Sequence, residues 1–304
     1  MLCSWINTYS RVSFWSFDNM YDESDCWVRM RFHKQDVIQL ARVLNLDGGS
    51  GTMRVGRPGR EHVFDTMEAL VTFLVRMARP CTWEELIPYL GGRCRDAYTE
   101  AFYAVLNHIY ENYAHCINDI TRWRGHMRTW ADAIHDVGAP APRCVGFIDG
   151  TFRASARPTR GQRQAYSGHK KLHGIKFQSV VAPNGLIVDF YGCVVGRRAD
   201  GYLLTRSKFV KRMRRLCRLE GRPYYVYGDP AYCLSQYILR GYKGACTRDQ
   251  AEFSAAMNRV RVTVEWGFAL IVRDWKFVDY RQSMRLLQQP VGHWPVLLPS
   301  PHGK

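Results

Sequence analysis

Several features that would assign this chain to a common class are missing from its sequence. It has no run of roughly 18 or more apolar residues, the length that a transmembrane helix needs. Its first residues, MLCSWINTYSRVSFWSFDN, contain no continuous apolar segment typical of a secretory signal. No internal repeat and no low-complexity stretch is visible, which argues against a solenoid or a disordered chain. We therefore expect a soluble protein of the nucleus or cytosol that has no membrane association.

Paired cysteine motifs are also missing. The ten cysteines are scattered singly, and no Cys-x-x-Cys pair is present to build a zinc site or a redox motif. We expect reduced, mostly buried thiols.

Acidic residues are few in comparison with basic ones. The 304 residues include 27 Asp and Glu against 43 Lys and Arg, a formal net charge of +16. A field of this sign attracts polyanions, so nucleic acid is the first candidate partner and an anionic membrane the second. Because 46% of the residues are apolar, the chain can bury a sizeable core in one or two domains.

The pattern along the chain changes from helical to strand-like near residue 139. We divide it into a poorly defined N-terminal segment (1–30), a helical domain (31–138), an α/β domain (139–290) and an irregular C-terminal tail (291–304). In the helical domain, Thr82 and Glu85 predict a capping box. Gly91 and Gly92 separate two helical stretches, which is typical of a helix-turn-helix but also of an ordinary helical bundle.

The second half alternates strand and helix patterns. Apolar, β-branched runs predict strands at 144–149, 171–183, 186–195 and 224–228, the second and third antiparallel, and amphipathic patterns predict helices at 205–220 and 249–274. This order predicts an α/β fold: an RNase H-like mixed sheet with flanking helices, preceded by an all-helical N-terminal domain.

Four acidic residues lie at the ends of short apolar runs or in them: Asp149, Asp200, Asp229 and Glu265. In an RNase H-like sheet the first strand is central, the fourth lies beside it and the late helix packs across, so Asp149, Asp229 and Glu265 would meet. Carboxylates are the ligands that Mg²⁺ and Mn²⁺ require, which predicts metal-dependent cutting of nucleic acid. Taken singly, each acid has another interpretation: Asp before Gly is a common turn residue, and Glu265 has Arg261 one turn earlier as an ion-pair partner.

Basic residues crowd the segments that follow two of these acids. The candidates for phosphate contact are Arg153, Arg157, Lys170, Lys171, Lys211, Arg212, Arg214 and Arg215. The other interpretation is a solvated charged face, but closely spaced cations repel one another, and a polyanion would relieve that repulsion.

The sequences of several segments resemble those of the Harbinger (PIF/Harbinger) transposases of the DDE superfamily. The segments are IDGTF, PNGLIVDFYG, GRRADGYLL, GDPAYCLSQYILRGYKG and NRVRVTVEWGFALI, within roughly residues 60–290. The resemblance implies that Asp149, Asp229 and Glu265 form the catalytic triad and that Asp200 is a fourth acid near the metals. The chain departs from the family at Ala199, where a histidine is frequent, and in its short Pro-rich tail.

The same resemblance implies a DNA transposase and endonuclease of the nucleus. It would cut and join phosphodiester bonds with two Mg²⁺ or Mn²⁺ ions, acting on double-stranded DNA at terminal repeats and at a target site. It would work with a Myb-like DNA-binding partner protein, and a homo-oligomer is compatible with it. Two alternatives stay open: a domesticated or decayed transposase that binds DNA without cleaving it, and another RNase H-like nuclease that acts on RNA hybrids.

Overall fold

The computed structural model describes residues 15–281 and 284–286, and it leaves the side chains of residues 262–268 and 270 undescribed. By its internal contacts the chain divides into two compact units after His108. This division lies earlier in the chain than the boundary that the sequence pattern indicates at residue 139. Within the described ranges, no helix combines the length and the apolar character needed to cross a membrane.

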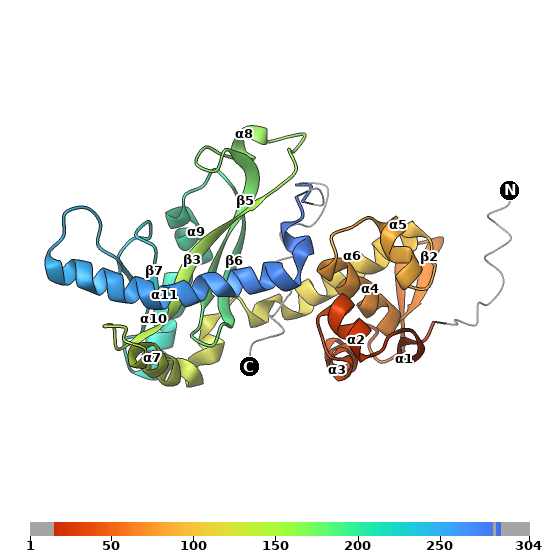
Figure 1. The fold of residues 1–304 in the computed structure, drawn as a ribbon, viewed down its shortest axis with the longest axis horizontal. Coiled ribbons are helices and arrows are strands. Elements are labelled where there is room, and N and C mark those ends of the chain that lie inside the picture. The colour runs from red at the N-terminus through yellow and green to blue at the C-terminus, as the bar shows by residue number, and fades with distance from the viewer. Residues whose placement is uncertain (1–14, 282–283, 287–304) are drawn as a thin grey trace. The chain divides into compact units, whose positions relative to one another are not determined.

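The first unit combines helices with one β-hairpin (Figure 1). Its elements are α1 (Phe17–Met20), α2 (Glu23–Asp25), a π-helical turn (Cys26–Met30), α3 (Lys34–Leu44), β1 (Thr52–Arg57), β2 (Arg60–Asp65), α4 (Thr66–Ala78), α5 (Trp83–Leu86), a 3-10 turn (Ile87–Tyr89) and the start of α6 (Arg95–Tyr113). The prediction of an all-helical domain is therefore wrong. Pro58 and Gly59 join the paired ends of β1 and β2 in a tight turn, and Gly59 has a φ of +83°, which favours glycine.

Two features of the first unit bear on the sequence-based expectations. The backbone N–H and hydroxyl of Thr82 donate to the Glu85 carboxylate at 3.2 and 2.8 Å, so the predicted capping contact is confirmed. Arg93 donates two hydrogen bonds, at 2.6 and 2.8 Å, to Glu68, whose side chain is only 2% exposed. Arg93 therefore has a structural partner, and a helix-turn-helix in this unit stays a prediction.

The second unit carries the predicted α/β elements. They are two 3-10 turns (Ala114–Cys116 and Ile120–His126), α7 (Met127–Asp136), β3 (Cys144–Ala154), α8 (Gln162–Ala165), β4 (Tyr166–Ser167), β5 (Leu172–Val181), β6 (Ile187–Val195), α9 (Asp200–Ser207), α10 (Phe209–Glu220), β7 (Tyr225–Gly228), β8 (Ile238–Arg240), α11 (Arg248–Asp274) and a 3-10 turn (Lys276–Asp279). The four predicted strands correspond to β3, β5, β6 and β7 and are confirmed, as is the long late helix, α11. The short strands β4 and β8 are additional to the prediction.

The sheet of this unit has the mixed topology expected of the sequence. β3 is central, with β5 antiparallel to it on one side and β7 parallel to it on the other. β6 pairs antiparallel with β5, and β8 pairs parallel with β7. This mixed α/β sheet with flanking helices fits an RNase H-like fold in general terms.

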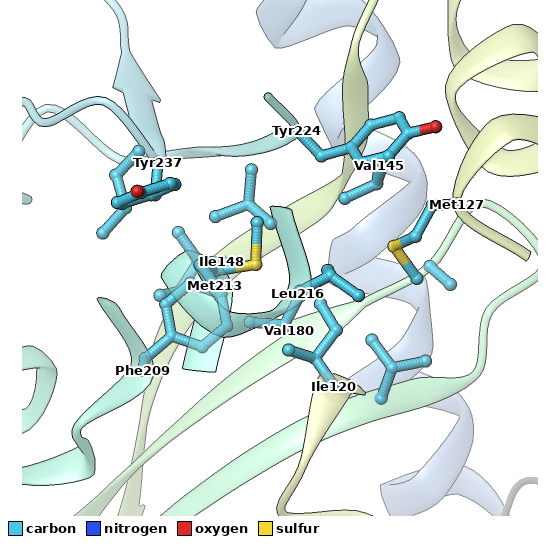
Figure 2. Packing of buried hydrophobic residues seen from close by; sticks show 14 of the residues in the cluster. Ile120, Met127, Val145, Ile148, Val180, Phe209, Met213, Leu216, Tyr224 and Tyr237 are labelled. Carbon is cyan, nitrogen blue, oxygen red and sulfur yellow. The ribbon is translucent and has the colours of Figure 1, made fainter. Parts of the chain in front are cut away.

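Helices cover the two faces of the sheet, and each face has its own apolar core. Phe209, Met213 and Leu216 of α10 pack in one cluster with Val145 and Ile148 of β3 and neighbouring strands (Figure 2). Met257 and Val260 of α11 pack in the other cluster, which includes Phe147 and Tyr227. Because neighbouring strand residues point to opposite faces, β3 contributes side chains to both cores.

The cysteines are less buried than expected. Of the nine cysteines that the structure describes, all are free and only Cys26 and Cys144 are buried. The prediction of mostly buried thiols is therefore wrong.

Candidate active site

Two of the candidate acids are brought together by the pairing of β3 and β7. Ile148 lies opposite Gly228 in this parallel pair, so the next residues lie side by side: Asp149 within β3, and Asp229 directly after β7. The run before Asp149 is fully buried, and Asp149 is the first partly exposed residue of β3. Gly228 allows the strands to approach, because a Cβ there would lie 2.6 Å from a methyl group of Ile148.

Asp200 joins this pair from α9, of which it is the first residue. A Cβ built on Gly150 would lie 2.9 Å from Asp200 Oδ1, so the side chain of Asp200 reaches the backbone next to Asp149. The Lys176 ammonium of β5 lies 3.0 Å from the same Asp200 oxygen. Glycine at position 150 is therefore what lets the third acid approach the first.

Helix α11 reaches the acids through Arg261. Its guanidinium donates to Asp149 Oδ1 at 3.3 Å, and another of its nitrogens lies 3.9 Å from Asp229 Oδ2. Glu265 is four residues further along α11, a spacing that brings two positions to the same face of a helix. The side chain of Glu265 lies outside the described residues, so its predicted place among the acids stays a prediction.

Burial and mutual repulsion dominate the electrostatics of Asp149. Burial raises its pKa, and the nearby Asp229 and Asp200 carboxylates raise it further, while the Arg261 guanidinium and a backbone N–H lower it. The three acids are therefore close enough to influence one another. Arg261 and Lys176 offset part of their negative charge.

Tyr232 lies beside the acids and is almost fully buried. The loop after β7 turns back at once, since the N–H groups of Ala231 and Tyr232 donate to the side chain and to the carbonyl of Asp229 at 2.6 and 2.9 Å. Tyr232 is 1% exposed, and its hydroxyl has no hydrogen-bond partner among the described residues. Burial, followed by the charges of Asp200 and Asp149, raises the pKa of Tyr232 well above its usual value.

The types of these donors suit a divalent cation, because three carboxylates lie near one another and near a buried hydroxyl that lacks a hydrogen-bond partner among the described residues. Among the side chains that the structure describes, however, no three of His, Cys, Asp and Glu are arranged so that they could hold a metal ion. Glu265 is not among those side chains. The ligand types therefore fit a metal site, and a complete site would need a fourth carboxylate.

The predicted phosphate-contacting residues fall into two environments. Arg153, Arg157 and Arg212 are engaged within the protein: Arg153 lies 3.2 Å from Asp279, Arg157 donates to Gln162 at 3.0 Å, and Arg212 donates two hydrogen bonds to Asp189 at 2.7 and 2.8 Å. The remaining five are exposed, on the turn between β4 and β5 and on α10: Lys170, Lys171, Lys211, Arg214 and Arg215.

Comparison with known proteins adds to this geometry. Residues 148–293 match the family model of the DDE superfamily endonucleases. The matched range contains all four candidate acids and begins one residue before Asp149. No curated protein and no solved structure was found to be similar. The match supports the DDE superfamily, a nuclease or transposase type of function and a DNA substrate, and it does not confirm the Harbinger subtype.

Within the matched range, sequence reasoning missed the two cations that contact the acids. Lys176 is one of many basic residues near the acids, and nothing local distinguishes it. Arg261 has a signal, because it lies one turn before Glu265, but that spacing indicates an ion pair within the helix rather than the contact with Asp149.

Proposed function

We propose that this protein is a DDE transposase or endonuclease of the Harbinger type, which cuts and joins DNA phosphodiester bonds with two Mg²⁺ or Mn²⁺ ions. Asp149, Asp229 and Glu265 are the catalytic residues, and Asp200 is the fourth metal-binding acid. The observation that supports this proposal most is the parallel pairing of β3 and β7, which sets Asp149 beside Asp229 with Asp200 next to them.

The protein's own residues supply placement and charge. Divalent ions bound by the acids would activate water or a 3′-hydroxyl and stabilise the leaving oxygen. Gly150 and Gly228 leave room for the carboxylates to converge, and the loop hydrogen bonds to Asp229 fix the end of β7. Arg261 and Lys176 balance part of the acidic charge, which holds the carboxylates together in the absence of substrate.

A second candidate function is DNA binding without cleavage, by a domesticated or decayed transposase. One observation favours it: Asp149, Asp200 and Asp229 each have a cationic side chain within 4 Å, as Lys176 contacts Asp200 and Arg261 contacts the other two. These ion pairs compete with a metal ion for the same oxygens.

A nicking assay on terminal-repeat DNA, with Mg²⁺ or Mn²⁺ titrated in, separates the two functions. We expect nicking by the wild type that requires the metal and that falls at least about a hundredfold in Asp149→Asn and in Glu265→Gln, since each change removes a charged ligand. DNA binding should persist in both variants. Binding without any metal-dependent nicking by the wild type would favour the second candidate, and equal nicking by wild type and variants would discard the assignment of these acids.

The wider context of the reaction belongs to the same proposal. The DNA substrates are the terminal repeats and a target site, a Myb-like protein is the DNA-binding partner, the protein acts in the nucleus, and a homo-oligomer is compatible with the reaction. Terminal inverted repeats flanking the gene would support this context.

A further inference from the structure

Helix α10 carries a stripe of cations that has no role in the acidic site. The stripe consists of four exposed residues: Lys211, Arg214, Arg215 and Arg218. At 100° per residue they lie on the side of the helix opposite Phe209, Met213 and Leu216, which are buried against the sheet. We call these four residues the α10 basic stripe.

No anion in the described part of the protein balances this stripe. Among the described residues, no ion pair involves any of its four members. Two exposed arginines of other helices, Arg128 and Arg248, differ from the stripe, because each has an acid one turn later, at 3.8 and 2.8 Å.

The spacing within the stripe adds repulsion. Lys211 and Arg215 are four residues apart, as are Arg214 and Arg218, and like charges at this spacing destabilise a helix by roughly 0.2–0.5 kcal/mol per pair. The neighbouring Arg212 behaves otherwise, since it is held by the buried Asp189. One cation of the helix therefore anchors it to the sheet, and the four others have no ion-pair partner in the described part of the chain.

We propose that the α10 basic stripe binds the phosphate backbone of duplex nucleic acid without reading its sequence. The stripe extends over about 10 Å at ~1.5 Å per residue, which corresponds to about three nucleotides along one strand. It lies on the helix that covers the face of the sheet opposite α11, so it is a surface distinct from the Arg261 side of the acidic site.

An anionic membrane fits this helix less well than a duplex does. Amphipathic helices that bind membranes insert an exposed apolar face between the lipids. The apolar face of α10 is instead buried in the protein core, where Phe209, Met213 and Leu216 are fully covered. The cationic side is what the helix offers to a partner, which suits a polyanion that is contacted through its charges.

The stripe can be tested in the full chain by measuring the anisotropy of a labelled 20-base-pair duplex of random sequence. The experiment uses the Asp149→Asn background in EDTA, so that its outcome is independent of cleavage and of the proposed nuclease function. The test variant adds Arg214→Glu and Arg218→Glu. The matched control adds Arg128→Glu and Arg248→Glu, which change the net charge equally on helices α7 and α11.

We expect the test variant to bind the duplex at least about tenfold more weakly and to lose about 2 from the slope of log affinity against log salt, as two phosphate contacts are removed. The control should change both quantities much less. Equal losses in the two variants would attribute binding to net charge and overturn the proposal, as would unchanged binding by the test variant. Binding of anionic vesicles that depends on the stripe while duplex binding does not would also overturn it.

Circular dichroism checks that α10 stays folded in the test variant. We expect it to do so, because the carboxylates introduced by Arg214→Glu and Arg218→Glu would each face a cation three residues earlier, at Lys211 and Arg215. If that variant does not fold, Arg214→Gln and Arg218→Gln take its place. The expected loss of affinity is then about half as large on a logarithmic scale, and its absence contradicts the proposal.

Discussion

At the scale of single residues, the acidic site depends on where side chains are missing as much as on where they are present. Gly150 and Gly228 each occupy a position where a Cβ would meet another atom closer than 3 Å. A Cβ on Gly150 would meet Asp200, and a Cβ on Gly228 would meet Ile148. The absence of both side chains therefore allows the acids to lie close together. The conformational freedom of glycine is secondary here, because neither residue has a positive φ.

Replacement of Gly150 by alanine should therefore impair the site without unfolding the protein. The added methyl group lies 2.9 Å from Asp200 Oδ1 and must push that carboxylate away. We expect metal-dependent nicking to fall at least about tenfold, while duplex binding and the unfolding temperature change little. Gly168→Ala is the matched control, since a Cβ there meets nothing within 4 Å. Equal nicking by Gly150→Ala and the control would show that nicking does not depend on the present position of the Asp200 carboxylate.

The ion pair of Glu68 and Arg93 is a second residue-scale feature, and it belongs to the first unit. Glu68 is almost fully buried and forms a bidentate ion pair with Arg93. The Arg93 guanidinium also lies 4.3 Å from the ring centre of Phe64. Burial raises the pKa of Glu68, and Arg93 lowers it. A buried carboxylate without its partner is costly, whereas an apolar pair of similar size is tolerated.

We expect Arg93→Met to destabilise the first unit by about 3 kcal/mol, because it leaves the Glu68 carboxylate unpaired. The double variant Glu68→Leu with Arg93→Met should recover most of that loss. Urea unfolding of the full chain measures the stability of both variants, through the transition in which the first unit unfolds. A single variant as stable as the wild type would mean that the pair contributes nothing to folding.

At the scale of elements, α10 is fixed to the sheet through one buried ion pair. Asp189 of β6 is 1% exposed on its side chain and accepts two hydrogen bonds from Arg212, whose third donor reaches the Ser207 carbonyl at 2.5 Å. Burial nevertheless raises the pKa of Asp189 to about 6, with Arg212 acting in the opposite direction. The pair therefore gives α10 a pH-dependent anchor.

The sign of that dependence follows from the raised pKa. Between about pH 4 and pH 6 the folded protein holds a proton on Asp189 that the unfolded chain has released, so the contribution of this group to the free energy of unfolding falls as the pH rises through that range. The total change is about 3 kcal/mol at ~1.4 kcal/mol per pKa unit. We expect the difference in unfolding free energy between wild type and Asp189→Asn to decrease by up to this amount from pH 4 to pH 7. A difference that is constant with pH, measured by urea unfolding, would contradict the raised pKa.

The elements that the sequence predicts correctly are those with a strong local signal. The run CVGFID is apolar and bounded, and it forms β3, while the apolar stripe that includes Met257 and Val260 forms part of α11. The hairpin of β1 and β2 was missed because its glycine-rich surroundings resemble a loop and only Val55 and Phe64 among its residues are buried. β8 was missed since it has three residues and exists through its parallel pairing with β7, which leaves no local pattern.

At the scale of the whole molecule, the sequence predicts that Asp149 and Asp229 lie on neighbouring strands, but it does not predict which cations contact them. The order of strands places Asp149 beside Asp229, as the sequence predicts for an RNase H-like sheet. The cations that accompany them come from β5 and α11, and no spacing rule identifies them, because their contacts are set by the tertiary packing. The fold likewise separates the basic residues of α10 into two groups. Arg212 pairs with the buried Asp189, whereas the α10 basic stripe is exposed.

We propose that Asp149, Asp200, Asp229 and Glu265 form one cation-binding site. Titration of Mn²⁺ into the full chain, followed by electron paramagnetic resonance, tests it most directly, with Glu252→Gln on the exposed face of α11 as the matched control. We predict that Asp149→Asn and Glu265→Gln each weaken Mn²⁺ binding at least about tenfold, while Glu252→Gln binds as the wild type does. Binding by Glu265→Gln that equals that of the wild type would contradict the account.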